Sequence, residues 1–504
     1  MINAVNDVVK SAVKKVVVLG GGTAGWMAAA LLKKVLATAV DIELVESEDI
    51  GTVGVGEATI PPIRLFNNVM GINEAEFLRE TKATIKLAIK FDNWRVPGEG
   101  YFHTFGAPGK SLAFCHFHHL WLRARQQGDK TDLWQYDLNY LCAMAGKFAP
   151  INAKDSILEL PYAYHFDAGL YARYLRKLSE QMGVVRHEGK VQQVFQHPSG
   201  DIKCLVLDDG RELSGDLFID CSGFRGLLIQ DKLNAGYDDW SHFLPCDRAV
   251  AVPSERFEKT IPYTRAIAHS AGWQWRIPLQ HRNGNGLVYS SAHYSDEQAS
   301  DLLLANLERK ALAEPKFLRF KTGRRRQQWQ RNVIAVGLSS GFLEPLESTS
   351  IHLIQSAVVR LIQLFPHNGI CQSAINEYNR QSELEYTQIR DFLILHYHVN
   401  QRNDSQFWRD MQQLAIPDSL HQKMAIFADN GQLFRDQNDL FLESSWLQVM
   451  LGQGIEPKDY HPIANNFSAE KLRDMLANIQ AIKQEPLGKL PDHDTFIQTM
   501  ISRS

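Results

Sequence analysis

A glycine-rich turn near the N-terminus constrains the fold of this chain more than any other feature. Segment 15–19 reads Lys-Val-Val-Val-Leu, a short apolar run typical of a buried strand. Gly20, Gly22 and Gly25 follow in the pattern G-x-G-x-x-G, and segment 26–32 continues as a predicted helix. A strand that passes through such a turn into a helix is typical of the first unit of a Rossmann-like parallel sheet.

The acid that usually completes this pattern is also present. Segment 41–46 predicts the next strand, and Glu46 ends it about 20 residues after the last glycine. Glycines let a turn approach a pyrophosphate, the helix start at Thr23 and Ala24 stabilises its charge, and an acid can bind ribose hydroxyls. The alternative is a tight strand–helix turn without a ligand, but the elements in register favour a bound dinucleotide.

A second glycine-bearing turn leads into a helix in segment 337–351. Segment 332–336 predicts a buried strand before it, and apolar residues recur at helical spacing after it. Ser348 and Thr349 occupy the position of a helix N-cap, where free N–H groups and the helix dipole favour an anion. Glu347 lies directly before that start, which is unusual because a carboxylate repels a bound anion. The plain alternative is a capped helix with a surface glutamate.

Two stretches between these turns are open to more than one interpretation. Segment 48–60 contains three glycines and runs through Glu57, so it either drapes over a bound ring or simply connects elements at the surface. Segment 84–94 alternates apolar and polar residues, which predicts a half-buried strand with Lys86 and Lys90 on its polar face. Lysines at such positions are usually solvated.

The second half of the chain predicts a mixture of strands and helices. Segment 162–181 predicts a helix, and segment 217–223 predicts a second buried strand that could pass close to a nucleotide. Segment 272–278 predicts one strand of an antiparallel sheet, with Trp273 and Trp275 on the same face. An aromatic stripe of this kind ordinarily packs a core. The remainder of the chain is mostly helical in pattern.

Composition excludes several classes of protein. The chain has 504 residues, is 44% hydrophobic and carries a net charge of -3, which predicts a sizeable core and argues against a general nucleic-acid binder. Its six cysteines form no C-x-x-C pair, and His116, His118 and His119 lack a ligand pattern, so no metal site is expected. We find no signal segment and no apolar stretch of membrane-spanning length, and we therefore expect a cytoplasmic protein.

Four stretches together resemble the flavin-dependent halogenases of the tryptophan halogenase family. They are the glycine turn 20–25, the lysine-bearing segment 86–94, the Trp-x-Trp-x-Ile-Pro run 273–278 and Pro-Leu-Glu-Ser-Thr-Ser at 345–350. The fold that this resemblance implies is α/β with α+β character: a Rossmann-like FAD-binding module of the flavin-monooxygenase type with an added antiparallel sheet. We expect this module within residues 1–370 and a mainly helical, substrate-covering module within residues 371–504.

The resemblance also implies a reaction. Reduced FAD reacts with molecular oxygen to give a flavin hydroperoxide, which oxidises chloride or bromide to hypohalous acid. That acid passes through a tunnel to Lys86, which presents the halogen to an electron-rich aromatic substrate. Glu347 polarises the electrophile or accepts the ring proton. A separate flavin reductase is expected to supply the reduced FAD, because the sequence shows no second nucleotide motif.

Further residues receive roles from the same resemblance. FAD binding is assigned to Gly20, Gly22, Thr23, Ala24, Gly25, Glu46, Glu57, Ala58, Leu338 and Ile351. The halide is assigned to the backbone of Ser348, Thr349 and Ser350. The substrate pocket is assigned to His103, Phe105 and Trp446, and the tunnel wall to Trp273, Trp275 and Pro278.

Two departures from the family pattern bear on the substrate. Ser350 replaces the glycine that many members carry after Ser-Thr, which adds bulk beside the halide. Trp446 and Leu447 stand where tryptophan-specific members carry adjacent tyrosines, so a hydroxyl that would clamp an amino-acid backbone is missing. This favours an indole-type ring, free or tethered, over free tryptophan.

Two other functions remain compatible with the sequence. One is an aromatic hydroxylase that uses the same flavin chemistry, and the other is a flavin-binding protein without turnover. The Trp-x-Trp-x-Ile-Pro run and Lys86 favour a halogenase over the hydroxylase, and the pair of Lys86 and Glu347 argues against the inactive protein. The ring position, the preferred halide and the choice between monomer and homodimer stay open.

Overall fold

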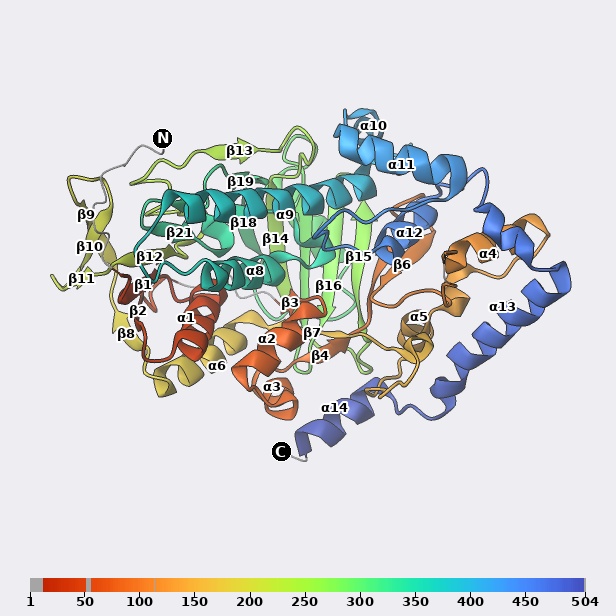
Figure 1. Ribbon diagram of the computed structural model, residues 1–504, viewed down its shortest axis with the longest axis horizontal. Coiled ribbons are helices and arrows are strands. Elements are labelled where there is room, and N and C mark those ends of the chain that lie inside the picture. The colour runs from red at the N-terminus through yellow and green to blue at the C-terminus, as the bar shows by residue number, and fades with distance from the viewer. Residues whose placement is uncertain (1–11, 51–55, 113, 503–504) are drawn as a thin grey trace, which may run out of the picture.

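The computed structural model describes residues 12–50, 56–112 and 114–502. A six-stranded sheet in the order β20-β21-β12-β1-β2-β8 forms the end of the molecule that carries the glycine turn (Figure 1). Its strands are β1 (Lys15–Leu19), β2 (Asp41–Glu46), β8 (Val185–Glu188), β12 (Leu217–Asp220), β20 (Trp329–Gln330) and β21 (Val333–Ala335). All neighbouring pairs are parallel except β20 with β21. Apolar strands buried on both faces suit such a sheet, because helices then cover it.

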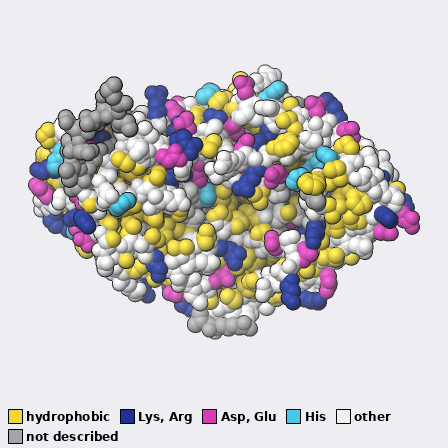
Figure 2. Space-filling view, in the orientation of Figure 1, with side chains coloured by type: hydrophobic (Ala, Val, Ile, Leu, Met, Phe, Trp, Pro, Cys, Tyr) yellow, Lys and Arg dark blue, Asp and Glu magenta, His cyan; other side chains and the backbone are white. Residues whose placement is uncertain are grey.

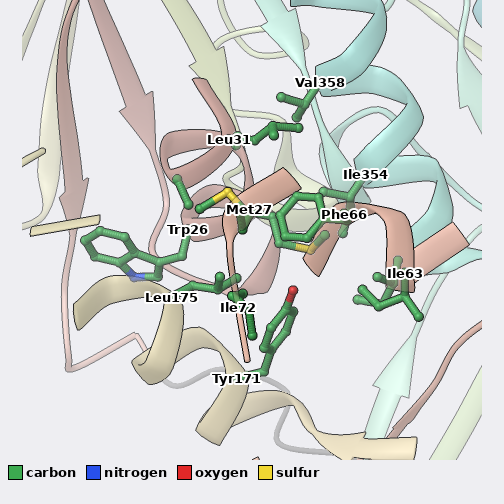
Figure 3. Close-up of a cluster of buried hydrophobic side chains, with 14 of the residues drawn as sticks. Trp26, Met27, Leu31, Ile63, Phe66, Ile72, Tyr171, Leu175, Ile354 and Val358 are labelled. Carbon is green, nitrogen blue, oxygen red and sulfur yellow. The ribbon is translucent and has the colours of Figure 1, made fainter. Parts of the chain in front are cut away.

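Helices pack on this sheet and against one another. They are α1 (Thr23–Leu36), α2 (Pro62–Met70), α6 (Ala168–Gln181) and α8 (Ser350–Gln363). Figure 3 shows Met27 and Leu31 of α1 facing Ile354 and Val358 of α8, with Phe66 of α2 between the two helices. The predicted strand, glycine turn and helix are confirmed, and the helices that follow the two glycine turns share one core.

A seven-stranded sheet occupies the centre of the molecule in the order β18-β14-β17-β16-β15-β5-β6 (Figure 1). Its strands are β5 (Ala88–Asp92), β6 (Gly100–Thr104), β14 (Arg248–Ser254), β15 (Tyr263–His269), β16 (Gly272–Pro278), β17 (Asn283–Tyr289) and β18 (Lys316–Arg319). Every pair is antiparallel except β5 with β15. β16 is buried along its whole length, which confirms the predicted sheet and places Trp273 and Trp275 inside the protein.

A small sheet in the order β3-β7-β4 corrects two predictions. Its strands are β3 (Gly56–Ala58), β4 (Thr84–Lys86) and β7 (Ala163–Asp167). Segment 84–94 is not one half-buried strand, because β4 and β5 belong to different sheets and are buried continuously from Thr84 to Ile89. Segment 162–181 is not one helix, because its aromatic start pairs as β7 between β3 and β4 before α6 begins.

Strand β4 is tied to distant parts of the chain. The backbone N–H of Ile85 donates to Nε2 of His493 (3.1 Å), in the last helix of the described chain. The hydroxyl of Thr84 donates to the backbone oxygen of Pro278 (2.7 Å), at the end of β16. These bonds fix the strand that carries Lys86 between the central sheet and the C-terminal helix.

The C-terminal part is helical, as predicted. Its helices are α9 (Gln372–His398), α10 (Gln406–Gln413), α11 (Asp418–Asn430), α12 (Glu443–Gly452), α13 (Ala469–Gln484) and α14 (His493–Ser502). Figure 1 shows α10 to α13 gathered at the end of the molecule opposite the six-stranded sheet, while α9 runs between the two ends. The C-terminal end of α9 therefore reaches the middle of the molecule, where its residues join the site described below.

The remaining elements include two further three-stranded sheets, in the orders β11-β10-β9 and β13-β19-β22. The helices are α3 (Glu74–Glu80), α4 (Phe117–Gln126), α5 (Leu138–Ala145) and α7 (Asp296–Ala305), and the strands are β9 (Val191–Gln196), β10 (Ile202–Leu207), β11 (Glu212–Ser214), β13 (Tyr237–Asp239), β19 (Gly323–Arg325) and β22 (Gly341–Phe342). Positive and negative side chains are interspersed over the face in Figure 2. Within the described ranges no helix is long and apolar enough to cross a membrane.

Candidate active site

The glycine turn between β1 and α1 leaves no room for side chains. Gly20 has a φ of +112°, a conformation that suits glycine. A Cβ atom on Gly25 would lie 1.8 Å from the carbonyl oxygen of Gly20, and one on Gly21 would lie 1.4 Å from Oε2 of Glu46. The first N–H groups of a helix have no partner within that helix. The turn is thus a cradle of backbone donors, which fits the pyrophosphate of a dinucleotide such as FAD.

Glu46 ends β2 beside this cradle. Its Oε1 accepts a hydrogen bond from Nε of Arg186 (2.6 Å), and its Oε2 accepts one from Nε1 of Trp26 (3.3 Å). These bonds hold the carboxylate where the fingerprint expects a ribose. A carboxylate offers about four acceptor positions, so Glu46 keeps capacity for ribose hydroxyls.

The second glycine-bearing turn meets the first. Gly337 has a φ of +73°, and a Cβ atom on it would lie 2.7 Å from Cβ of Ala24. Leu338 follows and borders a surface cavity of about 530 Å³. Glu57 and Ala58 lie on β3 in another sheet, while two of the three glycines of segment 48–60, Gly51 and Gly54, fall outside the described residues. The two turns therefore lie against each other at Gly337 and Ala24.

Lys86 is completely buried, unlike most strand lysines. Its Nζ donates to the backbone oxygen of Thr59 (3.0 Å) and to Oγ of Ser348 (2.8 Å), and it lies 5.2 Å from the ring centre of Phe105. Burial lowers the pKa of Lys86 from 10.5 to about 7, although the charge of Glu347 opposes this change. Near neutral pH the amine is thus available in both its charged and its neutral form.

The turn before α8 suits a small anion. Ser348 has left-handed backbone angles (φ 59°, ψ 36°), and Thr349 has right-handed ones (φ -89°, ψ -10°). Such a pair directs successive N–H groups into one concavity, a nest that binds anions. Thr349 is the N-cap of α8 as predicted, but its hydroxyl makes no capping bond and has no partner among the described residues. Ser350 then begins the helix, and Ile351 is buried.

Glu347 is buried between two histidines. Nδ1 of His103 donates to its Oε2 (2.8 Å), and Nε2 of His396 lies 2.7 Å from its Oε1, at an angle outside the range of a hydrogen bond. Burial raises the pKa of Glu347, but electrostatic attraction to the two nearby imidazoles and the hydrogen bond from His103 outweigh burial and lower the pKa to about 2. Glu347 is therefore ionised near neutral pH. Nδ1 of His396 in turn hydrogen-bonds the hydroxyl of Tyr101 (2.9 Å).

Aromatic side chains lie around His103. The ring centre of His103 lies 5.6 Å from that of Phe392 and 6.2 Å from that of Phe441. Phe392 stacks on Phe441 at 3.9 Å and contacts Trp446 at 4.8 Å. Nζ of Lys423 lies 4.2 Å above the ring of Trp446. The predicted substrate residue Trp446 is thus joined to His103 through Phe392.

The predicted tunnel residue Trp273 is bonded to the turn that carries Glu347. Its Nε1 donates to Oε2 of Glu344 (3.0 Å), which also accepts from the hydroxyl of Tyr397 (2.5 Å). Burial raises the pKa of Glu344 to about 7, although both hydrogen bonds oppose this change. The ring centre of Trp275 lies 6.2 Å from that of Trp273. The two tryptophans are therefore neighbours, and Trp273 is tied to the turn that carries Glu347.

The structure brings most of the predicted chemistry into one connected group and adds residues to it. A hydrogen bond joins Lys86 to Ser348, and another joins His103 to Glu347. Because Glu347 and Ser348 are adjacent in the turn, the four residues form one group. Sequence reasoning missed His396, because nothing in a helical pattern distinguishes one buried histidine. It also assigned no role to Glu344, although this residue directly precedes the Pro-Leu-Glu stretch 345–347. No cluster that could hold a metal ion occurs among the residues described.

Comparison with known proteins places this geometry in a family. A family model described as tryptophan halogenase matches residues 15–469. The structure resembles Xcc4156, a flavin-dependent halogenase from Xanthomonas campestris, with a TM-score of 0.95 and 48% identity, covering 97% of this chain and 98% of that one. It also resembles BrvH, a flavin-dependent halogenase from Brevundimonas sp. BAL3, with a TM-score of 0.93 and 42% identity, covering 97% and 99%.

A relative with a named substrate is more distant. The tryptophan 6-halogenase ThaL from Streptomyces albogriseolus is 36% identical over 491 residues, covering 89% of this chain and 91% of that protein. The fold and the catalytic class expected from the sequence are therefore confirmed, whereas the roles of individual residues stay predictions.

Proposed function

This chain belongs to the tryptophan halogenase family, and on that premise we propose that it halogenates a neutral, electron-rich ring of the indole type with reduced FAD, molecular oxygen and chloride or bromide. The family membership makes the protein a flavin-dependent halogenase. The substrate class, the halide and the residue roles are what the proposal adds. Each rests on a separate part of the site.

FAD would be held by the two glycine turns. The cradle at Gly20–Gly25 would bind the pyrophosphate, Glu46 the ribose, and the backbone around Gly337 the continuing chain of the cofactor. When bound, reduced FAD supplies the activation of oxygen that converts a halide into hypohalous acid. A separate flavin reductase is the expected source of reduced FAD.

The halide would bind in the nest formed by Ser348, Thr349 and Ser350. The supporting observation is the left-handed and right-handed pair of backbone conformations before α8. The unpartnered hydroxyl of Thr349 offers a further donor. Because the side chain of Ser350 adds bulk that glycine lacks, replacing it by glycine should favour bromide over chloride in competition.

The single observation that carries the proposal is the buried amine of Lys86, bonded to the hydroxyl of Ser348 in the halide turn. As an ammonium group it can hydrogen-bond hypohalous acid, and as a neutral amine it can form a haloamine. Because its pKa lies near 7, either form is accessible. Lys86 would therefore receive the oxidised halogen and present it to the ring.

Glu347 would stabilise the substrate ring at the stage where the ring carries a positive charge. Its carboxylate is ionised, buried and fixed by two histidines, so its field is strong and already oriented. Trp273 and Trp275 would separate the substrate from the flavin, so that the flavin cannot hydroxylate the ring directly. The bond from Trp273 to Glu344 supports a rigid barrier.

The lining near Trp446 supports a neutral substrate. Phe392, Phe441 and Trp446 offer ring faces, and the nearby charge of Lys423 is already paired with Asp436 and Asp439. An amino-acid zwitterion would need free charged partners, whereas indole needs only aromatic contact. Phe392 and His396 come from α9. We therefore keep the proposed division of the chain, in which a second module from residue 371 covers the substrate.

The test is a competition assay with purified protein. Reduced FAD, bromide and chloride would be supplied with indole, tryptophan and a set of phenols, and the products identified by mass. We expect halogenated indole as the main product, and Lys86→Ala should abolish it while flavin oxidation continues. Lys90→Ala is the matched control, because Lys90 is part-exposed and paired with Asp92. An oxygenated product that forms without halide would instead indicate a hydroxylase.

A further inference from the structure

His103 has one ring nitrogen engaged and one free. Its Nδ1 bonds to Glu347, while its Nε2 is buried and has no hydrogen-bond partner among the described residues. The side chain is 4% exposed, so water does not explain the free nitrogen by simple solvation. Buried polar atoms are nearly always paired in folded proteins, and an exception calls for a partner that binds later.

The bond to Glu347 determines which form of the histidine is present. An ionised carboxylate only accepts hydrogen bonds, so Nδ1 of His103 must carry the hydrogen in this contact. In the neutral ring, Nε2 is then an acceptor with an available lone pair. The arrangement of carboxylate, Nδ1–H and free Nε2 is that of a histidine held ready as a base.

Glu347 itself is less well placed to accept a proton. One oxygen is bonded to His103 and the other lies 2.7 Å from Nε2 of His396. Both contacts stabilise the ionised form, and a carboxylate stabilised in this way is a weak base. Among the described residues, the titratable groups that act on His103 include Glu347 and His396, while Lys86 acts on Glu347.

From this geometry we infer that Nε2 of His103 accepts the proton that leaves the substrate ring. Glu347 orients the imidazole and stabilises the positive charge that the imidazole then carries. The inference rests on the proposed halogenation. The ring carbon forms a bond to the halogen, the halogen–oxygen bond breaks, and hydroxide leaves with that electron pair. The ring C–H bond then breaks, its electrons restore aromaticity, and the proton moves to His103. The histidinium and the hydroxide together yield neutral histidine and water.

The packing around His103 supports this assignment over a purely stacking role. Phe392 meets the ring edge to face and Phe441 lies at a tilt, so neighbouring side chains fix its plane. A ring that served only as an apolar wall would not need a carboxylate on one nitrogen, since burying that charge is costly. A base at this position would contribute about 10²–10⁴-fold in rate.

The test compares His103→Phe with the wild-type protein on indole and on indole deuterated at its carbon positions. His103→Phe keeps a flat ring and the stacking contacts but removes the base. We expect turnover to fall by about 10²–10⁴-fold and a primary isotope effect to appear that the wild type lacks. Imidazole should restore turnover to His103→Ala, whose cavity can admit it.

The double variant separates the two residues. Glu347→Gln lets the amide donate to Nδ1, which moves the ring hydrogen to Nε2 and removes the acceptor. His103→Phe combined with Glu347→Gln should therefore be little worse than either change alone. A loss of rate without an isotope effect and without imidazole rescue would overturn the inference, while absence of halogenated product from the wild type would overturn the proposed function instead.

Discussion

Replacing Lys86 by methionine should stabilise the protein at low pH and destabilise it at high pH. Methionine has nearly the length of lysine and suits a buried site. In the folded protein burial lowers the pKa of Lys86 from 10.5 to about 7. Since one pH unit corresponds to about 1.36 kcal/mol, keeping this amine charged costs the fold about 5 kcal/mol.

The direction of the pH dependence follows from proton binding. Below pH 7 both folded and unfolded chains hold the proton, so the full penalty of about 5 kcal/mol applies. Between pH 7 and 10.5 the unfolded chain binds more protons than the folded one, so the wild-type free energy of unfolding rises with pH. Above 10.5 both forms are neutral and the penalty is gone.

Methionine also removes two hydrogen bonds. The backbone oxygen of Thr59 and the hydroxyl of Ser348 lose their donor, which costs about 2 kcal/mol in all. The variant should therefore be about 3 kcal/mol more stable than wild type at pH 6, and about 2 kcal/mol less stable at pH 10.5. The two stability curves should cross near pH 9.

Urea unfolding at pH 6, 8 and 10 measures this directly. Lys90→Met is the matched control, because Lys90 is part-exposed in the adjoining strand and its ion pair with Asp92 is screened. We expect no crossing for that control. Parallel curves for wild type and Lys86→Met would refute the reasoning, since they would mean that the amine keeps an ordinary pKa in the folded protein.

Three further predictions concern the cofactor turn and the barrier. Gly25→Ala should abolish the rise in melting temperature that FAD produces, because its Cβ would strike the carbonyl oxygen of Gly20, whereas Gly488→Ala, with open space around it, should keep that rise. Glu344→Gln should leave the free energy of unfolding unchanged at pH 4.5 and raise it by about 3 kcal/mol at pH 8. Burial raises the pKa of this carboxyl from 4.5 to about 7, so the wild type must bury a charge at pH 8 that glutamine does not carry. Equal effects at both pH values would count against a buried acid. Trp273→Phe should cost about 1–3 kcal/mol in thermal unfolding by removing a donor from Glu344, and should increase hydrogen peroxide released per halogenated product; an unchanged ratio would contradict the barrier role.

Local patterns predicted the cofactor end of the fold well. The strand, the turn at Gly20–Gly25 and helix α1 are contiguous, and each is specified by the residues within it. The same holds for the turn before α8, where the predicted N-cap Thr349 lies at the helix start. Backbone donors at a helix start depend on chain geometry alone, so a sequence can reveal them.

The features that the sequence did not predict depend on contacts between elements that lie far apart in the chain. The alternation around Lys86 suggested a solvated face, but the strand breaks at Leu87 and its two halves enter different sheets. His396 approaches Glu347 from a helix, and the hydrogen bond from Ile85 to His493 joins residues 408 positions apart. No local period encodes such meetings, because they arise only when separate elements pack together.

That last bond has a consequence for the order in which the protein is made. A ribosome that adds about 5–20 residues per second needs roughly 20–80 s to travel from Ile85 to His493. The cofactor turn of a nascent chain can close early, whereas the strand carrying Lys86 lacks one of its ties until the final helix emerges. The strand proposed to receive the oxidised halogen therefore gains one of its hydrogen bonds only after more than 400 further residues have been made.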